Sequence, residues 1–138
     1  MKSIEPNRPI SVQEQALLRA ALERAPRAPE ASALLSTVGS LQVVGQCECG
    51  CGSISFASVA PHQHPLIVAD AIAESAHGSV GIIVRSVLSH IVELELYALS
   101  AEPSEGWPTP GSVRPWEAGH AAQPTLQADG PASGGPAA

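Results

Sequence analysis

The N-terminal part of the chain carries a helical pattern of apolar residues. Apolar side chains recur at intervals of three and four residues between Leu18 and Ala25, which places them on one face of an α-helix. Ser11 and Glu14 match a capping box, in which each side chain accepts a hydrogen bond from the backbone N–H of the other residue. The pattern therefore predicts a helix over residues 11–25.

A second, shorter helix is predicted over residues 30–38. Pro29 suits the entry to this helix, and Gly39 suits the left-handed residue that follows its last turn. The two helices together form a predicted helical hairpin. The residues before them, 1–10, include prolines at two positions and are expected to form a flexible lead-in.

After residue 40 the pattern changes from helical periodicity to the alternation typical of strands. The predicted strands are 41–44, 53–58, 66–74, 80–87 and 90–99. The alanines in 66–76 also permit a helix, so the sequence leaves this run open between strand and helix. Turns at 77–78 and 88–89 join neighbouring strands directly, which favours an antiparallel sheet. The expected fold class is α+β, with the N-terminal helical hairpin packed on an antiparallel sheet of about five strands.

The last predicted strand carries different side chains on its two faces. One face is apolar and consists of Val92, Leu94, Leu96 and Ala98. The other face is half polar and consists of Ile91, Glu93, Glu95 and Tyr97. This alternation predicts a sheet that is covered on one face only.

The length of 138 residues predicts one domain, which we place at residues 11–100. From residue 101 to 138, Pro, Gly and Ala dominate and the apolar periodicity ends. Such a segment buries too little surface to offset the entropy lost on ordering, so 101–138 is expected to be a disordered tail. Within it, Trp107 is able to fold back onto the edge of the domain.

The charge balance and the apolar runs exclude several classes of function. Asp and Glu number 13 against 7 Lys and Arg, so the chain lacks the clustered cations that bind nucleic acid. No apolar run is long enough to cross a bilayer, and the first residues lack the apolar region of a secretory signal. We therefore expect a cytoplasmic protein without nucleic-acid or membrane partners. A protein partner is compatible with the acidic balance, and the sequence specifies no oligomeric state.

All 3 cysteines of the chain lie close together, as Cys47, Cys49 and Cys51, with glycines between and after them. Thiolates this close favour soft or borderline metal ions, and Zn²⁺ and Cu(I) are the expected ones. His62 and His64, in the next predicted loop, are candidates for a further ligand, because three cysteines and one histidine are a known zinc set. The Cys-x-Cys spacing differs from the Cys-x2-Cys spacing of zinc knuckles.

The same cysteines permit two other interpretations. A thiol redox function would use a Cys-x-Cys bridge, which closes a very small and strained ring. Alternatively, the cysteines are small packing residues in a glycine-rich bend, and the protein holds no cofactor. A separate alternative is a non-enzymatic interaction module, an inhibitor or adaptor, that uses the acidic sheet face with Glu93 and Glu95. No nucleophile elbow, phosphate loop or pair of catalytic carboxylates is recognisable, so no catalytic residue is assigned.

Two segments carry a resemblance to a known family. Residues 43–51 read Val-Val-Gly-Gln-Cys-Glu-Cys-Gly-Cys, and residues 89–98 read Ser-His-Ile-Val-Glu-Leu-Glu-Leu-Tyr-Ala. They resemble the motif Val-Val-Gly-Arg-Cys-Gly-Cys-Gly-Cys and the late strand Ser-x-Leu-Glu-Val-Tyr-Ser of a family of short, uncharacterised bacterial proteins. The resemblance covers about residues 11–108 and implies the architecture and the cysteine motif, without an established activity. Gln46 and Glu48 stand where the family pattern has Arg and Gly, so the resemblance does not extend to an anion site built on that arginine.

Overall fold

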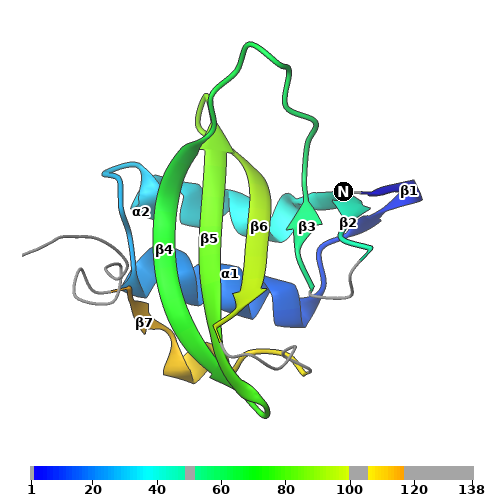
Figure 1. Ribbon diagram of the computed structural model, residues 1–138. Helices are drawn as coiled ribbons and strands as arrows, with labels where there is room; N and C mark the ends of the chain where they lie inside the picture. The colour runs from blue at the N-terminus through cyan, green and yellow to red at the C-terminus, as the bar shows by residue number, and fades with distance from the viewer. Residues whose placement is uncertain (1, 49–51, 100–105, 117–138) are drawn as a thin grey trace, which may run out of the picture.

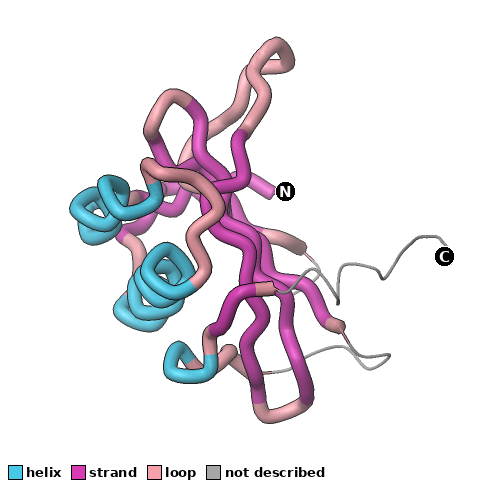
Figure 2. The backbone as a smooth tube through the Cα atoms, turned by 90° about the vertical axis from the view of Figure 1, so that its left-hand side faces the viewer, coloured by secondary structure: helices cyan, strands magenta, loops and turns pink. Residues whose placement is uncertain are grey.

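One antiparallel sheet forms the centre of the molecule, and the helices lie on one side of it (Figures 1 and 2). The computed structural model describes residues 2–48, 52–99 and 106–116. The strands are β1 (Lys2–Pro9), β2 (Gln42–Gln46), β3 (Ile54–Ser55), β4 (Leu66–Ser75), β5 (Gly78–Val87), β6 (His90–Ala98) and β7 (Arg114–Pro115). Their order across the 7-stranded sheet is β1-β2-β3-β6-β5-β4-β7. The predicted α+β class and antiparallel sheet are confirmed, and the strand count exceeds the five expected.

The first helix of the helical layer is as predicted, whereas the second changes from α-helix to 3₁₀ helix. The elements of this layer are the α-helices α1 (Val12–Arg24) and α2 (Ala31–Leu34) and the 3₁₀ helices η1 (Leu35–Ser40) and η2 (Pro110–Ser112). The capping box of α1 is confirmed, since the Glu14 N–H donates to Ser11 Oγ and the Ser11 N–H donates to Glu14 Oε1. The second predicted helix is a single α turn that continues directly as the 3₁₀ helix η1. In this part the hydroxyls of Ser36 and Thr37 donate to carbonyls three residues earlier. No helix within the described ranges is both long and apolar enough to span a membrane.

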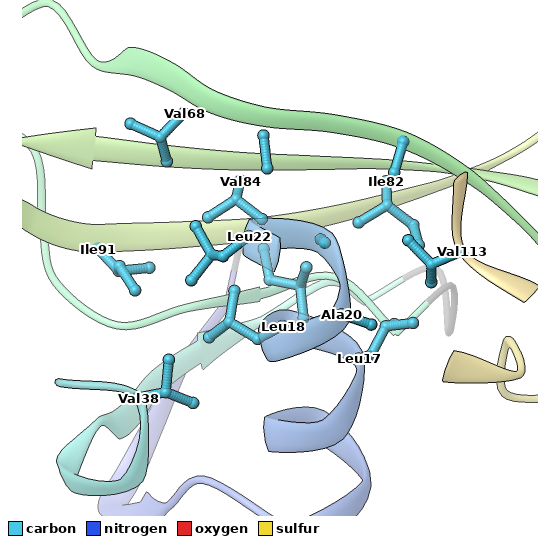
Figure 3. Packing of buried hydrophobic residues seen from close by; sticks show 14 of the residues in the cluster. Leu17, Leu18, Ala20, Leu22, Val38, Val68, Ile82, Val84, Ile91 and Val113 are labelled. Atoms are coloured by element: carbon cyan, nitrogen blue, oxygen red, sulfur yellow. The ribbon is translucent and has the colours of Figure 1, made fainter. Parts of the chain in front are cut away.

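The core lies between α1 and the central strands. Leu17, Leu18 and Leu22 of α1 are almost fully buried. Figure 3 shows these leucines on the helix beneath Ile82 and Val84 of β5. Burial of three leucines stabilises the helix on the sheet by about 1.5–3 kcal/mol per side chain. The opposite face of the sheet has no helix on it within the described part of the chain (Figure 2).

The run that the sequence left open between strand and helix is the strand β4. It pairs along nearly its whole length with β5. Its alanines Ala69, Ala71 and Ala73 are completely buried in the core that the sheet shares with α1. The alanines are therefore small packing residues of a buried strand, a role that their weak strand propensity does not reveal.

The predicted face pattern of β6 is correct at Leu94 and wrong at the start of the strand. The register between β5 and β6 shifts, because Arg85 pairs with Glu93 whereas Ser86 pairs with Ile91. Val92 is therefore an extra residue in a β-bulge. As a result Ile91 belongs to the core cluster (Figure 3), and Val92 is buried outside that cluster.

The prediction of a flexible lead-in over residues 1–10 is wrong. Most of this segment is β1, which pairs with β2 at Lys2 and Ser3 and again at Arg8 and Pro9, with a shift of register between the two stretches. Proline lacks the N–H of a ladder hydrogen bond, but it is accepted in a strand at the edge of a sheet. The prolines that indicated a lead-in are therefore compatible with an edge strand.

The prediction of a disordered tail over residues 101–138 is wrong for residues 106–116, which we call the C-terminal strap. The strap contains η2 and β7 and runs along the edge of β4 (Figure 1). The Thr109 N–H donates to the carbonyl of Glu74 over 2.8 Å, so backbone groups of the edge strand find partners. Trp107 packs against the core, as expected. The rest of the predicted tail lies outside the described residues.

Candidate functional site at the cysteine turn

The cysteine turn, residues 47–53, connects β2 to β3. These two strands are antiparallel neighbours in the sheet. Beyond their last pair, the N–H of Cys47 donates to the carbonyl of Ser53 over 3.0 Å, and this bond closes the base of the turn. Cys47 is half-buried, whereas the candidate ligands Cys49 and Cys51 lie outside the described residues.

Ser53 fixes the end of the turn to β6. Its hydroxyl accepts a hydrogen bond from the N–H of Leu96 over 2.8 Å and donates to the carbonyl of Leu96 over 3.1 Å. Ser53 is only 4% exposed, so both bonds are shielded from water. The side chain thereby stands in for a neighbouring strand at this point of β6 and holds the turn against the sheet.

A cavity of about 240 Å³ opens beside the turn. It is lined by Arg8, Glu14, Gln46, Cys47, Gly52, Ser53, Ile54 and Trp107. Four segments meet here, namely β1, the start of α1, the turn with its flanking strands, and the C-terminal strap. The volume lies below the range of roughly 300–1,000 Å³ typical of pockets for drug-sized ligands, so the cavity suits an ion or a very small group.

An internal ion pair forms one wall of this cavity. The guanidinium of Arg8 donates to both carboxylate oxygens of Glu14, over 2.9 Å and 2.8 Å. Burial opposes the ionisation of Glu14, but hydrogen bonds from Arg8 and the Ser11 N–H hold the pKa of this carboxyl below its ordinary value. The hydrogen bond to Glu14 in turn raises the pKa of Arg8. The two charges compensate each other, so neither group is an unpaired charge facing Cys47.

Trp107 packs directly on the last part of the turn. A Cβ atom built at Gly52 would lie 3.0 Å from Cζ3 of the Trp107 indole. Gly52 has a φ of 91°, a conformation that side-chain-bearing residues rarely adopt. Glycine is therefore required here twice, for the backbone conformation and for the close approach of the indole.

The structure does not bring His62 and His64 to Cys47. Their loop leaves the opposite end of β3 from the cysteine turn (Figure 1). Both imidazoles are exposed, and the loop is held by its own bonds, because Gln63 accepts from the Ala60 N–H and donates its N–H to the Ala60 carbonyl. Among the described residues, no group of three or more His, Cys, Asp and Glu side chains is placed to hold a metal ion.

On the half-polar face of the sheet, the acidic side chains form ion pairs with an arginine of the same face. Arg85 donates to Glu93 over 2.9 Å and to Glu95 over 2.6 Å. Tyr97 lies on the same face, and burial, together with the negative charges of Asp70 and Glu95, raises the pKa of its hydroxyl. The acidic face expected from the sequence is thus an ion-paired network around one arginine.

Sequence reasoning did not assign Arg8, Glu14 or Trp107 to the surroundings of the cysteines. Glu14 was identified only through its capping-box spacing, which is a local signal. The contacts of Arg8 and Trp107 with this site join segments distant in sequence, and no local pattern reports such contacts.

Comparison of the chain with family models, with curated proteins and with solved structures finds no match. The resemblance described above therefore stays a prediction. The assignment of function rests on the cysteine turn and its surroundings.

Proposed function

We propose that this protein is a small, non-enzymatic cytoplasmic protein that binds a thiophilic metal ion, Zn²⁺ or Cu(I), through the cysteine turn. The observation that carries the proposal is the closed base of the turn, the bond from the Cys47 N–H to the Ser53 carbonyl. Cys49 is two residues from Cys47, and Cys51 is two residues from Ser53. Chain connectivity therefore limits each of them to within roughly 7 Å of an anchored residue, measured between Cα atoms.

The placement of Cys47 supports this proposal over a role in packing. A packing cysteine is expected to be fully buried among apolar side chains. Cys47 is instead half-buried and lines a cavity together with a charged pair and an indole. A cysteine at a partly open cavity is accessible to an incoming ion.

The ligand set proposed is Cys47, Cys49 and Cys51 without His62 and His64. The loop with both histidines begins at the far end of β3, so a Cys3His site would require that loop to rearrange. Structural zinc sites take four ligands, whereas soft thiolates suit Cu(I) as well as Zn²⁺. A site of three thiolates is therefore proposed to favour Cu(I), with zinc requiring an additional ligand.

The alternative of an interaction module on the acidic sheet face gains no support from the contacts of Glu93 and Glu95. Both carboxylates already bond to Arg85. Charge reversal at these positions would break the internal network and would also change stability. This alternative stays a prediction without a contact that favours it.

A competition experiment tests the proposal. Zn²⁺ and Cu(I) are each offered to tag-free protein in the presence of a chromogenic chelator, and the metal withdrawn from the chelator is measured. We expect the wild type to withdraw metal and the variant C47S/C49S/C51S to lose this ability. The matched control H62A/H64A is expected to behave as the wild type. Withdrawal no greater than that of the triple serine variant would contradict the proposal.

A further inference from the structure

We propose that the outer edge of β4 at residues 70–74, which we call the 70–74 edge, is a docking surface for the same strand of a second copy of this protein, and that the C-terminal strap covers this surface in the single chain. β4 has 10 residues and lies at the opposite side of the sheet from β1, with the two-residue strand β7 beyond it. An uncovered strand of this length is a template for pairing with another chain. The role of this edge does not depend on metal binding at the cysteine turn.

The first half of the outer side of β4 is covered by the segment that follows α1. The Arg27 N–H donates to the carbonyl of Val68 over 2.8 Å, and the Asp70 N–H donates to the carbonyl of Ala25 over 3.1 Å. Every second residue of a strand directs its backbone groups to the same side. The residues of β4 with even numbers therefore point outward, and the segment after α1 satisfies the first of them.

The strap covers the 70–74 edge. The Trp116 N–H donates to the carbonyl of Asp70 over 3.1 Å, and the Thr109 N–H donates to the carbonyl of Glu74 over 2.8 Å. The Glu74 N–H in turn donates to Ser112 Oγ over 2.8 Å. Between these bonds, β7 pairs with β4 at two positions. A hydroxyl and a two-residue strand thus occupy the place where a regular neighbouring strand would pair.

The polar contacts that hold the strap lie at the surface. Arg24, at the end of α1, donates to the carbonyls of Pro110 and Gly111 over 3.2 Å and 2.9 Å, in exposed positions. Arg114 forms an ion pair with Glu74 over 3.1 Å, in which the two side chains are 52% and 46% exposed. Exposed ion pairs of this kind contribute little to stability.

The apolar attachment of the strap is small. Val113 is 4% exposed and belongs to the core (Figure 3), and Trp107 is partly buried against that core. β4 pairs with β5 along nearly its whole length on its other side, without help from the strap. Lifting the strap therefore frees the backbone groups of the 70–74 edge while β4 stays in the sheet.

The charges of the edge favour one register for pairing with a second copy. In an antiparallel pair of two such edges, Ile72 opposite itself would bring Asp70 against Glu74 of the other copy, and like charges directly opposite are destabilising. A two-fold axis at Ala71 would require the Asp70 N–H, which already bonds to the segment after α1. An axis at Ala73 places Ile72 opposite Glu74 of the other copy and avoids both conflicts. The same surface then serves both copies, as a closed two-fold dimer requires.

The experiment weakens the strap in the full chain with Thr109→Pro and Ser112→Ala together. Thr109 has a φ of −78°, which proline accepts, so T109P removes the N–H donor without strain in φ. S112A removes the acceptor of the Glu74 N–H. Gly111→Ala is the matched control on the strap, because a Cβ at this position meets no atom within 4 Å. Val38→Ala is the control for lost core stability, because this buried side chain lies away from the strap (Figure 3).

Sedimentation velocity measures the oligomeric state, and hydrogen exchange measures the Glu74 amide, at low and at high protein concentration. A reductant and a chelator are present throughout, so that the cysteines form no link between copies. We expect T109P/S112A to form a dimer as its concentration rises, and wild type, G111A and V38A to keep their mass. At low concentration the Glu74 amide of the double variant should exchange about tenfold faster than in the wild type, because its hydrogen bond is lost. At high concentration this amide should regain protection, because the second copy supplies an acceptor.

Three outcomes would overturn the inference. The first is a double variant with the mass of the wild type at every concentration. The second is a dimer whose Glu74 amide stays fast at high concentration, since the contact would then lie elsewhere on the molecule. The third is a V38A protein that dimerises to the same extent. If T109P/S112A does not fold, Arg24→Ala loosens the strap from the side of α1 and should give the same dimer, and an R24A protein with the mass of the wild type would contradict the inference.

Discussion

The pairing of Gly81 with Tyr97 provides a sharp test of how the two central strands pack. Gly81 of β5 lies directly opposite Tyr97 of β6. A Cβ built at Gly81 would overlap the ring carbons Cζ, Cε1 and Cε2 of the tyrosine. The phenol ring therefore covers the glycine on the half-polar face of the sheet.

The magnitude of the Gly81→Ala effect follows from two opposing terms. Overpacking against a side chain that must move costs about 1–3 kcal/mol. Replacing a strand glycine by alanine returns about 0.5–1 kcal/mol, because the unfolded chain loses conformational freedom. The net expectation is a loss of about 0.5–2 kcal/mol in the free energy of unfolding. In a Tyr97→Ala background the clash is absent, and the same substitution should stabilise by about 0.5–1 kcal/mol.

The assay is urea unfolding of wild type, G81A, Y97A and G81A/Y97A, followed by circular dichroism, with the m-value checked for each protein. The expected coupling energy is about 1–3 kcal/mol, and the effect of G81A reverses its sign between the two backgrounds. A G81A cost that is the same with and without Tyr97 would refute the reasoning.

Three further predictions concern single sites. Ser53→Ala should lower the free energy of unfolding by about 1–3 kcal/mol, because it removes the hydroxyl that bonds to the buried N–H and carbonyl of Leu96. Thermal unfolding measures this loss, with Ser58→Ala at an exposed serine as the control. Leu88 and Ser89 adopt φ values of 49° and 65°, so the double substitution to Asn-Gly should stabilise the hairpin by about 1–2 kcal/mol, and an unchanged unfolding midpoint would argue against this strain. Glu14 has a folded-state pKa below its ordinary value of 4.5, so its stabilising contribution is complete above that pH and is lost as the pH falls through the lower folded-state value. The free energies of unfolding of wild type and Glu14→Gln, measured across this pH range, should therefore differ above pH 4.5 and converge as the pH falls through the folded-state pKa of Glu14.

Local patterns predicted the parts of the fold that depend on local physics. The capping box of Ser11 and Glu14 placed the start of α1 correctly, because both hydrogen bonds lie within one turn. The alternation around Leu94 identified a strand with one apolar face. The strand β1 was not predicted, because prolines usually interrupt strands. Only its pairing with β2 shows that it lies at the edge of the sheet.

Other features depend on contacts that no short segment encodes. The bulge at Val92 exchanges the faces of neighbouring residues, and it is visible only in the register between β5 and β6. At the candidate site, the cysteine motif itself was recognisable from its composition. The position of Trp107 beside Gly52 depends on the path of the strap across the molecule, and the separation of His62 from Cys47 depends on the direction of β3.

The most direct test of the proposed metal site is native mass spectrometry with thiol counting on freshly purified, tag-free protein. We expect a mass increment that matches zinc or copper and thiols that react with an alkylating reagent only after a chelator is added. We further expect both the increment and the protection to be absent from C47S/C49S/C51S and present in H62A/H64A. A bare mass after incubation with either metal, with thiols that alkylate at once, would contradict the central claim.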